Sequence, residues 1–86
     1  MKHVEFNTNG VCSKKIIFDL TDDGKIVNLI YIGGCNGNLK AISKLCEGQD
    51  AKHISSILKG NSCGGRPTSC ADQLSKAILE AINSTN

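Results

Sequence analysis

Five cysteines are the residues of this chain whose type and placement could perform chemistry. Cys63 and Cys70 flank a glycine-rich turn that leads into a predicted helix, while Cys12 and Cys35 lie at the ends of predicted strands. Cys46 lies within a helical pattern. Thiolate sulfur is a ligand for zinc and for iron–sulfur clusters, and it is also the nucleophile of thiol–disulfide exchange. The sequence therefore predicts either metal binding or redox chemistry.

Four of the cysteines form the predicted metal site, namely Cys12, Cys35, Cys63 and Cys70. Four thiolates suit a tetrahedral zinc ion or an iron–sulfur cluster, although the chain lacks the Cys-x-x-Cys pair of zinc fingers and zinc ribbons. Alternatively, a redox-active dithiol passes electrons to a partner enzyme, with Cys63 paired to Cys70 or Cys12 paired to Cys35. Cys46 shares an apolar helical face, so we expect it in the core.

Turn residues divide the chain into segments that alternate first as strands and then as helices. Period-two patterns predict strands at 3–7, 11–20 and 25–32, separated by turns that contain Asn-Gly and Asp-Gly. Helical spacing predicts helices at about 38–47, 50–58 and 69–82. The expected fold is a single α+β domain over residues 1–86. It comprises a three-stranded antiparallel meander followed by two or three helices packed on one sheet face.

The predicted hairpin over residues 11–32 brings two of the cysteines together. If its turn centres on the Asp-Asp pair, paired residues have numbers that sum to about 45. Cys12 then lies opposite Gly33 or Gly34, one step from Cys35. These two cysteines form the first half of the predicted site.

The second half lies around the start of the last predicted helix. Thr68 or Ser69 can cap that helix, which places Cys70 at its first turn, where the thiolate form of cysteine is favoured. A flexible Gly-Gly link joins Cys63 to this position. A four-thiolate site requires that this half meets the half formed by Cys12 and Cys35.

Length and charge exclude several classes of function. The chain has 86 residues and a net charge of +2, and its lysines are dispersed, which disfavours nucleic-acid binding. No apolar stretch approaches the ~20 residues that span a membrane, and no signal-peptide pattern is present, so we expect a cytoplasmic protein. In a reducing compartment, cysteines more often bind metals or act in redox chemistry than form structural disulfides. A small aliphatic core is often supported by a metal or a partner, so a protein partner or a homodimer is expected.

The sequence shows no recognisable set of catalytic residues, so we expect no enzymatic activity from the domain on its own. The segment 33–38 lies between a strand and a helix, but it matches neither G-x-G-x-x-G nor the P-loop, and a tight turn explains it better. No Ser/His/Asp or Cys/His arrangement is present. A third interpretation is a domain without metal, whose exposed turn binds a protein or a nucleotide.

The motif Thr68-Ser69-Cys70-Ala71-Asp72, preceded by Cys63-Gly64-Gly65, resembles the signature of the TSCPD domain. The resemblance extends to Gly10-Val11-Cys12-Ser13, to Gly33-Gly34-Cys35 and to Gly37-Asn38-Leu39, and so covers most of the chain. Similar proteins are small, stand-alone bacterial proteins marked by four cysteines, and related domains occur at the carboxyl ends of adenosylcobalamin-dependent ribonucleotide reductases. The resemblance implies metal binding and an accessory role alongside ribonucleotide reduction. Ala71 replaces the proline of the motif, and the chain lacks a reductase catalytic domain, so reductase activity is not implied.

Overall fold

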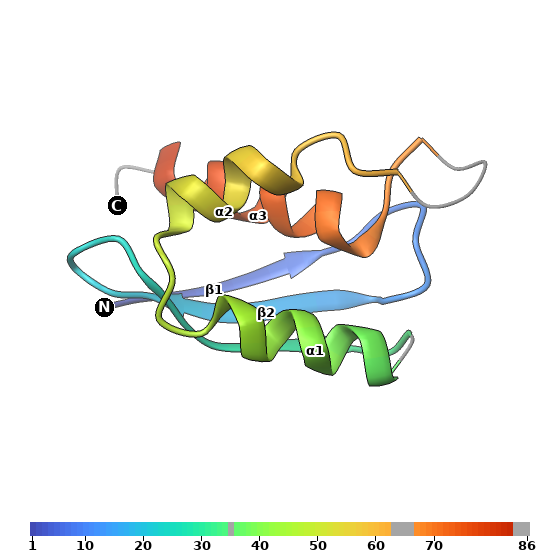
Figure 1. Cartoon of the computed structure of the whole chain (residues 1–86), viewed down its shortest axis with the longest axis horizontal. Coiled ribbons are helices and arrows are strands. Elements are labelled where there is room, and N and C mark those ends of the chain that lie inside the picture. Colours follow the sequence, from blue (N-terminus) through green and yellow to red (C-terminus); the bar gives the residue numbers. More distant parts are fainter. Residues whose placement is uncertain (35, 63–66, 84–86) are drawn as a thin grey trace.

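A computed structural model describes residues 1–34, 36–62 and 67–83 of the chain. The strands form one antiparallel sheet in the order β1-β2-β3, and three helices follow. Helices α2 and α3 lie side by side over the sheet, and α1 runs along β3 (Figure 1). The predicted α+β meander is therefore confirmed. The elements are β1 (Lys2–Asn7), β2 (Lys15–Leu20), β3 (Ile26–Ile32), α1 (Asn36–Cys46), α2 (Ala51–Leu58) and α3 (Cys70–Asn83).

The central strand β2 forms because its apolar residues alternate. Ile16, Phe18 and Leu20 are buried on one face, where partly buried side chains of β1 pack beside them. The strand begins at Lys15 rather than at residue 11, because the preceding loop closes on itself. The backbone N–H of Thr8 donates to the Lys14 carbonyl at 3.1 Å, and the Thr8 hydroxyl donates to the Ser13 carbonyl at 2.5 Å. Residues 8–14 therefore form a loop that carries Cys12 at the end of the sheet.

The hairpin of β2 and β3 adopts nearly the predicted register. Lys15 pairs with Ile32 and Leu20 pairs with Ile26, and an irregularity lies between these pairs. At this irregularity Asn28 has a φ of 58°, in the left-handed region that asparagine tolerates better than most residues. Its backbone N–H donates to Glu47 Oε1 at 2.9 Å, which fastens the end of α1 to the edge strand. The open end of the hairpin, where Lys15 pairs with Ile32, therefore lies next to the loop that contains Cys12.

The core lies between the helices and one face of the sheet. Buried residues of β2 and β3 pack with Leu74, Ala77 and Ile78 of α3 and with Cys46 of α1. Cys46 is 3% exposed, so the prediction that it is a core residue is confirmed. Burial raises the pKa of its thiol, which keeps the sulfur protonated and apolar.

The helices α2 and α3 pack closely because small residues face each other. The hydroxyl of Ser75 donates to the Ser55 carbonyl at 2.8 Å, and the two hydroxyl oxygens lie 3.1 Å apart. Asp50 caps α2 by accepting a hydrogen bond from the His53 backbone N–H at 2.9 Å. These contacts fix α3, and therefore Cys70 at its first position, relative to the rest of the fold. Within the described ranges, none of the helices is long and apolar enough to cross a membrane.

Candidate thiol site

Cys12 and Cys70 lie next to each other although 58 positions separate them in the chain. Cys12 belongs to the loop between β1 and β2, and Cys70 is the first residue of α3. Their Sγ atoms are 3.8 Å apart. Cys12 is exposed and Cys70 is partly buried. The fold therefore brings together Cys12, from the first predicted half of the site, and Cys70, from the second.

The other two predicted ligands, Cys35 and Cys63, lie outside the described residues. The described residue before Cys35 nevertheless contacts the site, because a Cβ built on Gly34 would lie 3.2 Å from the Cys12 sulfur. On the other side, the hydroxyl of Ser69 donates to the backbone carbonyl of Asn61, so the described chain that leads toward Cys63 is tied to the residue before Cys70. The chain on the amino-terminal side of each cysteine thus approaches the thiol pair.

Two residues that the sequence did not single out contact Cys70. The Ser13 hydroxyl lies 3.1 Å from the Cys70 sulfur, and Ser13 is buried. The Tyr31 hydroxyl donates to the Cys70 backbone carbonyl at 3.0 Å. Burial, followed by the nearby Cys70 and Cys46 thiols, raises the pKa of Tyr31, so its hydroxyl remains a hydrogen-bond donor. Ser13 follows Cys12 directly, but no local pattern reveals that Tyr31 reaches the start of α3.

The polar residues of the Thr-Ser-Cys-x-Asp motif hold the start of α3 in place. Ser69 caps the helix, because its Oγ accepts a hydrogen bond from the Asp72 backbone N–H at 3.0 Å. Asp72 is 4% exposed, and its carboxylate accepts hydrogen bonds from the Thr68 hydroxyl at 2.5 Å and from the Gly60 backbone N–H at 2.7 Å. The Thr68 hydroxyl makes the largest contribution to lowering the pKa of Asp72. The motif thereby fixes the backbone on both sides of Cys70.

A second chain of contacts joins the motif to the loop that carries Cys12. Gln73 donates from its side-chain amide to the Thr68 hydroxyl at 3.1 Å. Its side-chain oxygen accepts from the Asn9 backbone N–H, also at 3.1 Å. Gln73 is buried. The loop 8–14 and the start of α3 are therefore linked by hydrogen bonds as well as by the proximity of their sulfurs.

Histidine and carboxylate side chains do not add to this site in the part of the chain that the structure describes. No group of three or more His, Cys, Asp or Glu residues suited to a metal ion occurs there. His3 contacts Asp19 at 2.8 Å and Glu5 at 3.0 Å, and the hydrogen bonds to these carboxylates raise the pKa of His3.

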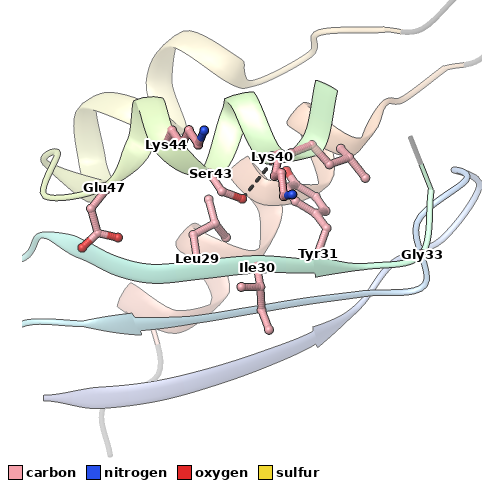
Figure 2. Close-up of a pocket in the computed structure, with 9 residues that line it drawn as sticks. Leu29, Ile30, Tyr31, Gly33, Lys40, Ser43, Lys44 and Glu47 are labelled. Atoms are coloured by element: carbon pink, nitrogen blue, oxygen red, sulfur yellow. Dashed lines mark hydrogen bonds between the residues drawn. The ribbon is translucent and has the colours of Figure 1, made fainter. Parts of the chain in front are cut away.

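A separate pocket of about 410 Å³ lies between α1 and β3. Figure 2 shows Lys40, Ser43 and Lys44 on the helix side and Leu29 and Tyr31 on the strand side. The Ser43 hydroxyl donates to the Leu39 carbonyl at 2.9 Å, so it is engaged within its own helix. Tyr31 lines this pocket and also donates a hydrogen bond to the Cys70 carbonyl, so it connects the pocket to the thiol site.

Alanine at Gly34 is expected to lower the free energy of unfolding by about 2–4 kcal/mol, as measured by urea denaturation. Gly34 has a φ of +86°, and an added Cβ would lie 2.8 Å from Leu39 Cδ1 and 3.1 Å from the Ser13 backbone nitrogen. The matched control is Gly24→Ala, where φ is +82° and nothing lies within 4 Å. It should cost only the left-handed strain, about 1–2 kcal/mol. Equal costs at the two positions would contradict the close packing of Gly34 beside the thiol pair.

The fold and the site define a small α+β domain in which a sequence motif positions one member of a thiol pair. A family model described as the TSCPD domain matches residues 2–82, and the chain belongs to the TSCPD domain family. Comparisons with curated proteins and with solved structures give no match.

Proposed function

We propose that this protein is a small metal-binding module that uses the thiolates of Cys12, Cys35, Cys63 and Cys70. The observation that carries the proposal is the 3.8 Å separation of the Cys12 and Cys70 sulfurs. In a tetrahedral zinc site with Zn–S bonds of about 2.3 Å, the sulfurs lie about 3.8 Å apart. The spacing of these two sulfurs therefore fits two corners of such a site.

The supply of two further ligands is supported by the chain next to them. Gly34 packs against the Cys12 sulfur immediately before Cys35, and Asn61 is bonded to Ser69 shortly before Cys63. Both cysteines are therefore within a short length of chain from the thiol pair. A bound zinc ion would supply structural cross-linking, and an iron–sulfur cluster would supply electron transfer.

The neighbours of Cys70 have defined tasks in this proposal. Ser13 places its hydroxyl beside the sulfur, and hydrogen bonds to thiolates tune the properties of a metal site. Tyr31 holds the Cys70 carbonyl, and Ser69 with Asp72 fixes the helix start. These contacts keep the Cys70 sulfur oriented toward Cys12 before any ligand arrives, which lowers the cost of assembling the site.

The proposed role is that of an accessory protein in the cytoplasm, acting alongside ribonucleotide reduction and through contact with a protein partner or a second copy of itself. The resemblance of the chain to domains of adenosylcobalamin-dependent ribonucleotide reductases supports a role alongside ribonucleotide reduction.

Metal analysis of the anaerobically purified full chain tests the proposal. We expect stoichiometric zinc, or iron with the visible absorption of a cluster, and loss of that metal in Cys12→Ser and Cys70→Ser. Cys46→Ala is the matched control and should retain the metal, because Cys46 is buried in the core. A folded, reduced protein that contains no metal and does not take up added Zn²⁺ or reconstituted iron and sulfide would overturn the proposal.

A further inference from the structure

We propose that Cys12 and Cys70 form a reversible intramolecular disulfide when hydrogen peroxide oxidises the protein. Their sulfurs are 3.8 Å apart, so the two thiols are in contact without being bonded to each other. The sequence suggested two dithiols, Cys63 with Cys70 and Cys12 with Cys35. The proposed disulfide instead joins one cysteine of the first to one cysteine of the second. The proposal concerns redox chemistry and goes beyond metal binding.

The positions of the two cysteines allow the bond to form with local movement. A disulfide bond is about 2.05 Å long, so the sulfurs must approach each other by about 1.8 Å. Cys70 is held from behind, because Tyr31 bonds to its carbonyl and Ser69 caps its helix. Cys12 lies in a loop outside the strands and is exposed. Rotation of the Cys12 side chain and a small shift of its loop can supply the approach while α3 stays in place.

The reaction balances with peroxide as the oxidant. The thiolate of one cysteine attacks a peroxide oxygen, the O–O bond breaks, and a sulfenic acid and hydroxide form. The second thiolate then attacks the sulfenic sulfur, the S–S bond forms, and the S–O bond breaks with release of hydroxide. With the protons of the two thiols the products are one disulfide and two waters. A dithiol reductant returns the two electrons by thiol–disulfide exchange, which begins at the exposed Cys12.

The same structure explains why Cys46 should not take part. Cys46 is 3% exposed and packs in the hydrophobic core. Burial raises the pKa of its thiol and so depletes the reactive thiolate. Peroxide should therefore react with Cys12 and Cys70 in preference to Cys46.

Oxidation and metal binding exclude each other at these sulfurs. A sulfur in a disulfide lacks the negative charge that a thiolate ligand supplies, so the bond between Cys12 and Cys70 would release a metal held by the four cysteines. This consequence alone rests on the proposed function. The disulfide itself requires only the proximity of the two thiols.

Mass-spectrometric mapping of the oxidised protein tests the proposal. The full chain is reduced, stripped with a chelator, treated with hydrogen peroxide, alkylated and digested without reductant. We expect the peptide that links Cys12 to Cys70 as the main cross-link, its loss on treatment with dithiothreitol, and its absence from Cys12→Ser and Cys70→Ser. Cys46→Ala should form it at the wild-type rate.

Several outcomes would overturn the disulfide. A main cross-link between Cys63 and Cys70 or between Cys12 and Cys35 would do so, and so would oxidation of Cys12 to sulfinic acid without any link. Circular dichroism of each variant shows that it is folded before it is oxidised. The metal-stripped sample separates this proposal from the metal site, because the link should form there whether or not the purified protein carries metal. Zinc release during oxidation of a metal-loaded sample tests only whether disulfide formation and metal binding exclude each other.

Discussion

Alanine at Asp72 is expected to lower the free energy of unfolding by about 3 kcal/mol, as measured by urea denaturation at pH 7. The Asp72 carboxylate is buried and accepts hydrogen bonds from the Thr68 hydroxyl and the Gly60 backbone N–H, which alanine would leave without this acceptor. The buried Thr68 hydroxyl, once unsatisfied, carries the full cost of its lost hydration. The loss should therefore be far larger than for an average surface substitution.

Two further variants separate the charge from the hydrogen bonds. Asp72→Asn keeps one oxygen that can accept from Gly60, so it should cost less than alanine, about 1–2 kcal/mol. Asp22→Ala removes an exposed carboxylate, and it should change stability by no more than about 0.5 kcal/mol. If Asp72→Ala matched Asp22→Ala, the buried network would have no role in stability.

The pH dependence of stability provides an independent check on Asp72. Hydrogen bonds from Thr68 and Gly60 lower the folded-state pKa of Asp72 below the ordinary value of about 3.9. The stabilisation from this group is therefore complete well above pH 4 and is lost as the pH falls through the lowered pKa. Asp72→Asn removes this titration, so its stability should fall less steeply than that of the wild type below pH 4.

The role of Asp72 also reaches the thiol pair. Asp72 and Ser69 fix the backbone on either side of Cys70, so loosening them should let the Cys70 sulfur move away from Cys12. We therefore expect Asp72→Asn, while still folded, to hold Cys12 and Cys70 together less tightly than the wild type does. The spacing within the Thr-Ser-Cys-x-Asp motif then has a physical reason, since each polar residue in it positions the cysteine.

The parts of the fold that the sequence predicted are those governed by local periodicity. The period-two pattern over residues 11–20 predicted a strand, and its alternating residues Ile16, Phe18 and Leu20 are all buried in β2. The helical face that carries Cys46 predicted a core residue, and Cys46 packs in the core. In both cases a repeating apolar pattern determines which side of the strand or helix faces the core, so the sequence alone is enough to predict the buried residues.

The parts that the sequence did not predict depend on contacts between distant segments. Strand β2 starts at Lys15 because Thr8 closes the preceding loop, which no apolar pattern marks. The sequence predicted that the half with Cys12 and Cys35 meets the half with Cys63 and Cys70, but it did not predict that Cys12 and Cys70 are the two cysteines in contact. That contact depends on how α3 packs across the sheet, and Tyr31 reaches Cys70 for the same reason. The spacing of these residues along the chain therefore predicts neither the contact of Cys12 with Cys70 nor that of Tyr31 with Cys70.

If the protein binds the proposed metal, removal of that metal is expected to lower stability more than the substitutions at Gly34 and Asp72 do. If four thiolates hold a structural ion, treatment with a strong chelator should lower the free energy of unfolding by about 5 kcal/mol or more. Zinc-finger peptides owe about 10–16 kcal/mol to their metal, but they lack a core of their own. Here Phe18, Ile26 and Leu74 form a fully buried apolar core, so the stripped protein should remain folded at reduced stability.

Thermal denaturation with and without chelator, applied to three proteins, checks this prediction. Cys70→Ser should be as unstable as the chelated wild type, and chelation should not lower it further, because both changes remove the same ion. Cys46→Ala should lose as much stability on chelation as the wild type does, since its sulfur lies in the core. A chelator effect that persisted undiminished in Cys70→Ser would place the metal elsewhere. Because the sulfurs of Cys12 and Cys70 already have the spacing of a zinc site, the expected cost reflects lost bonds rather than a rearranged fold.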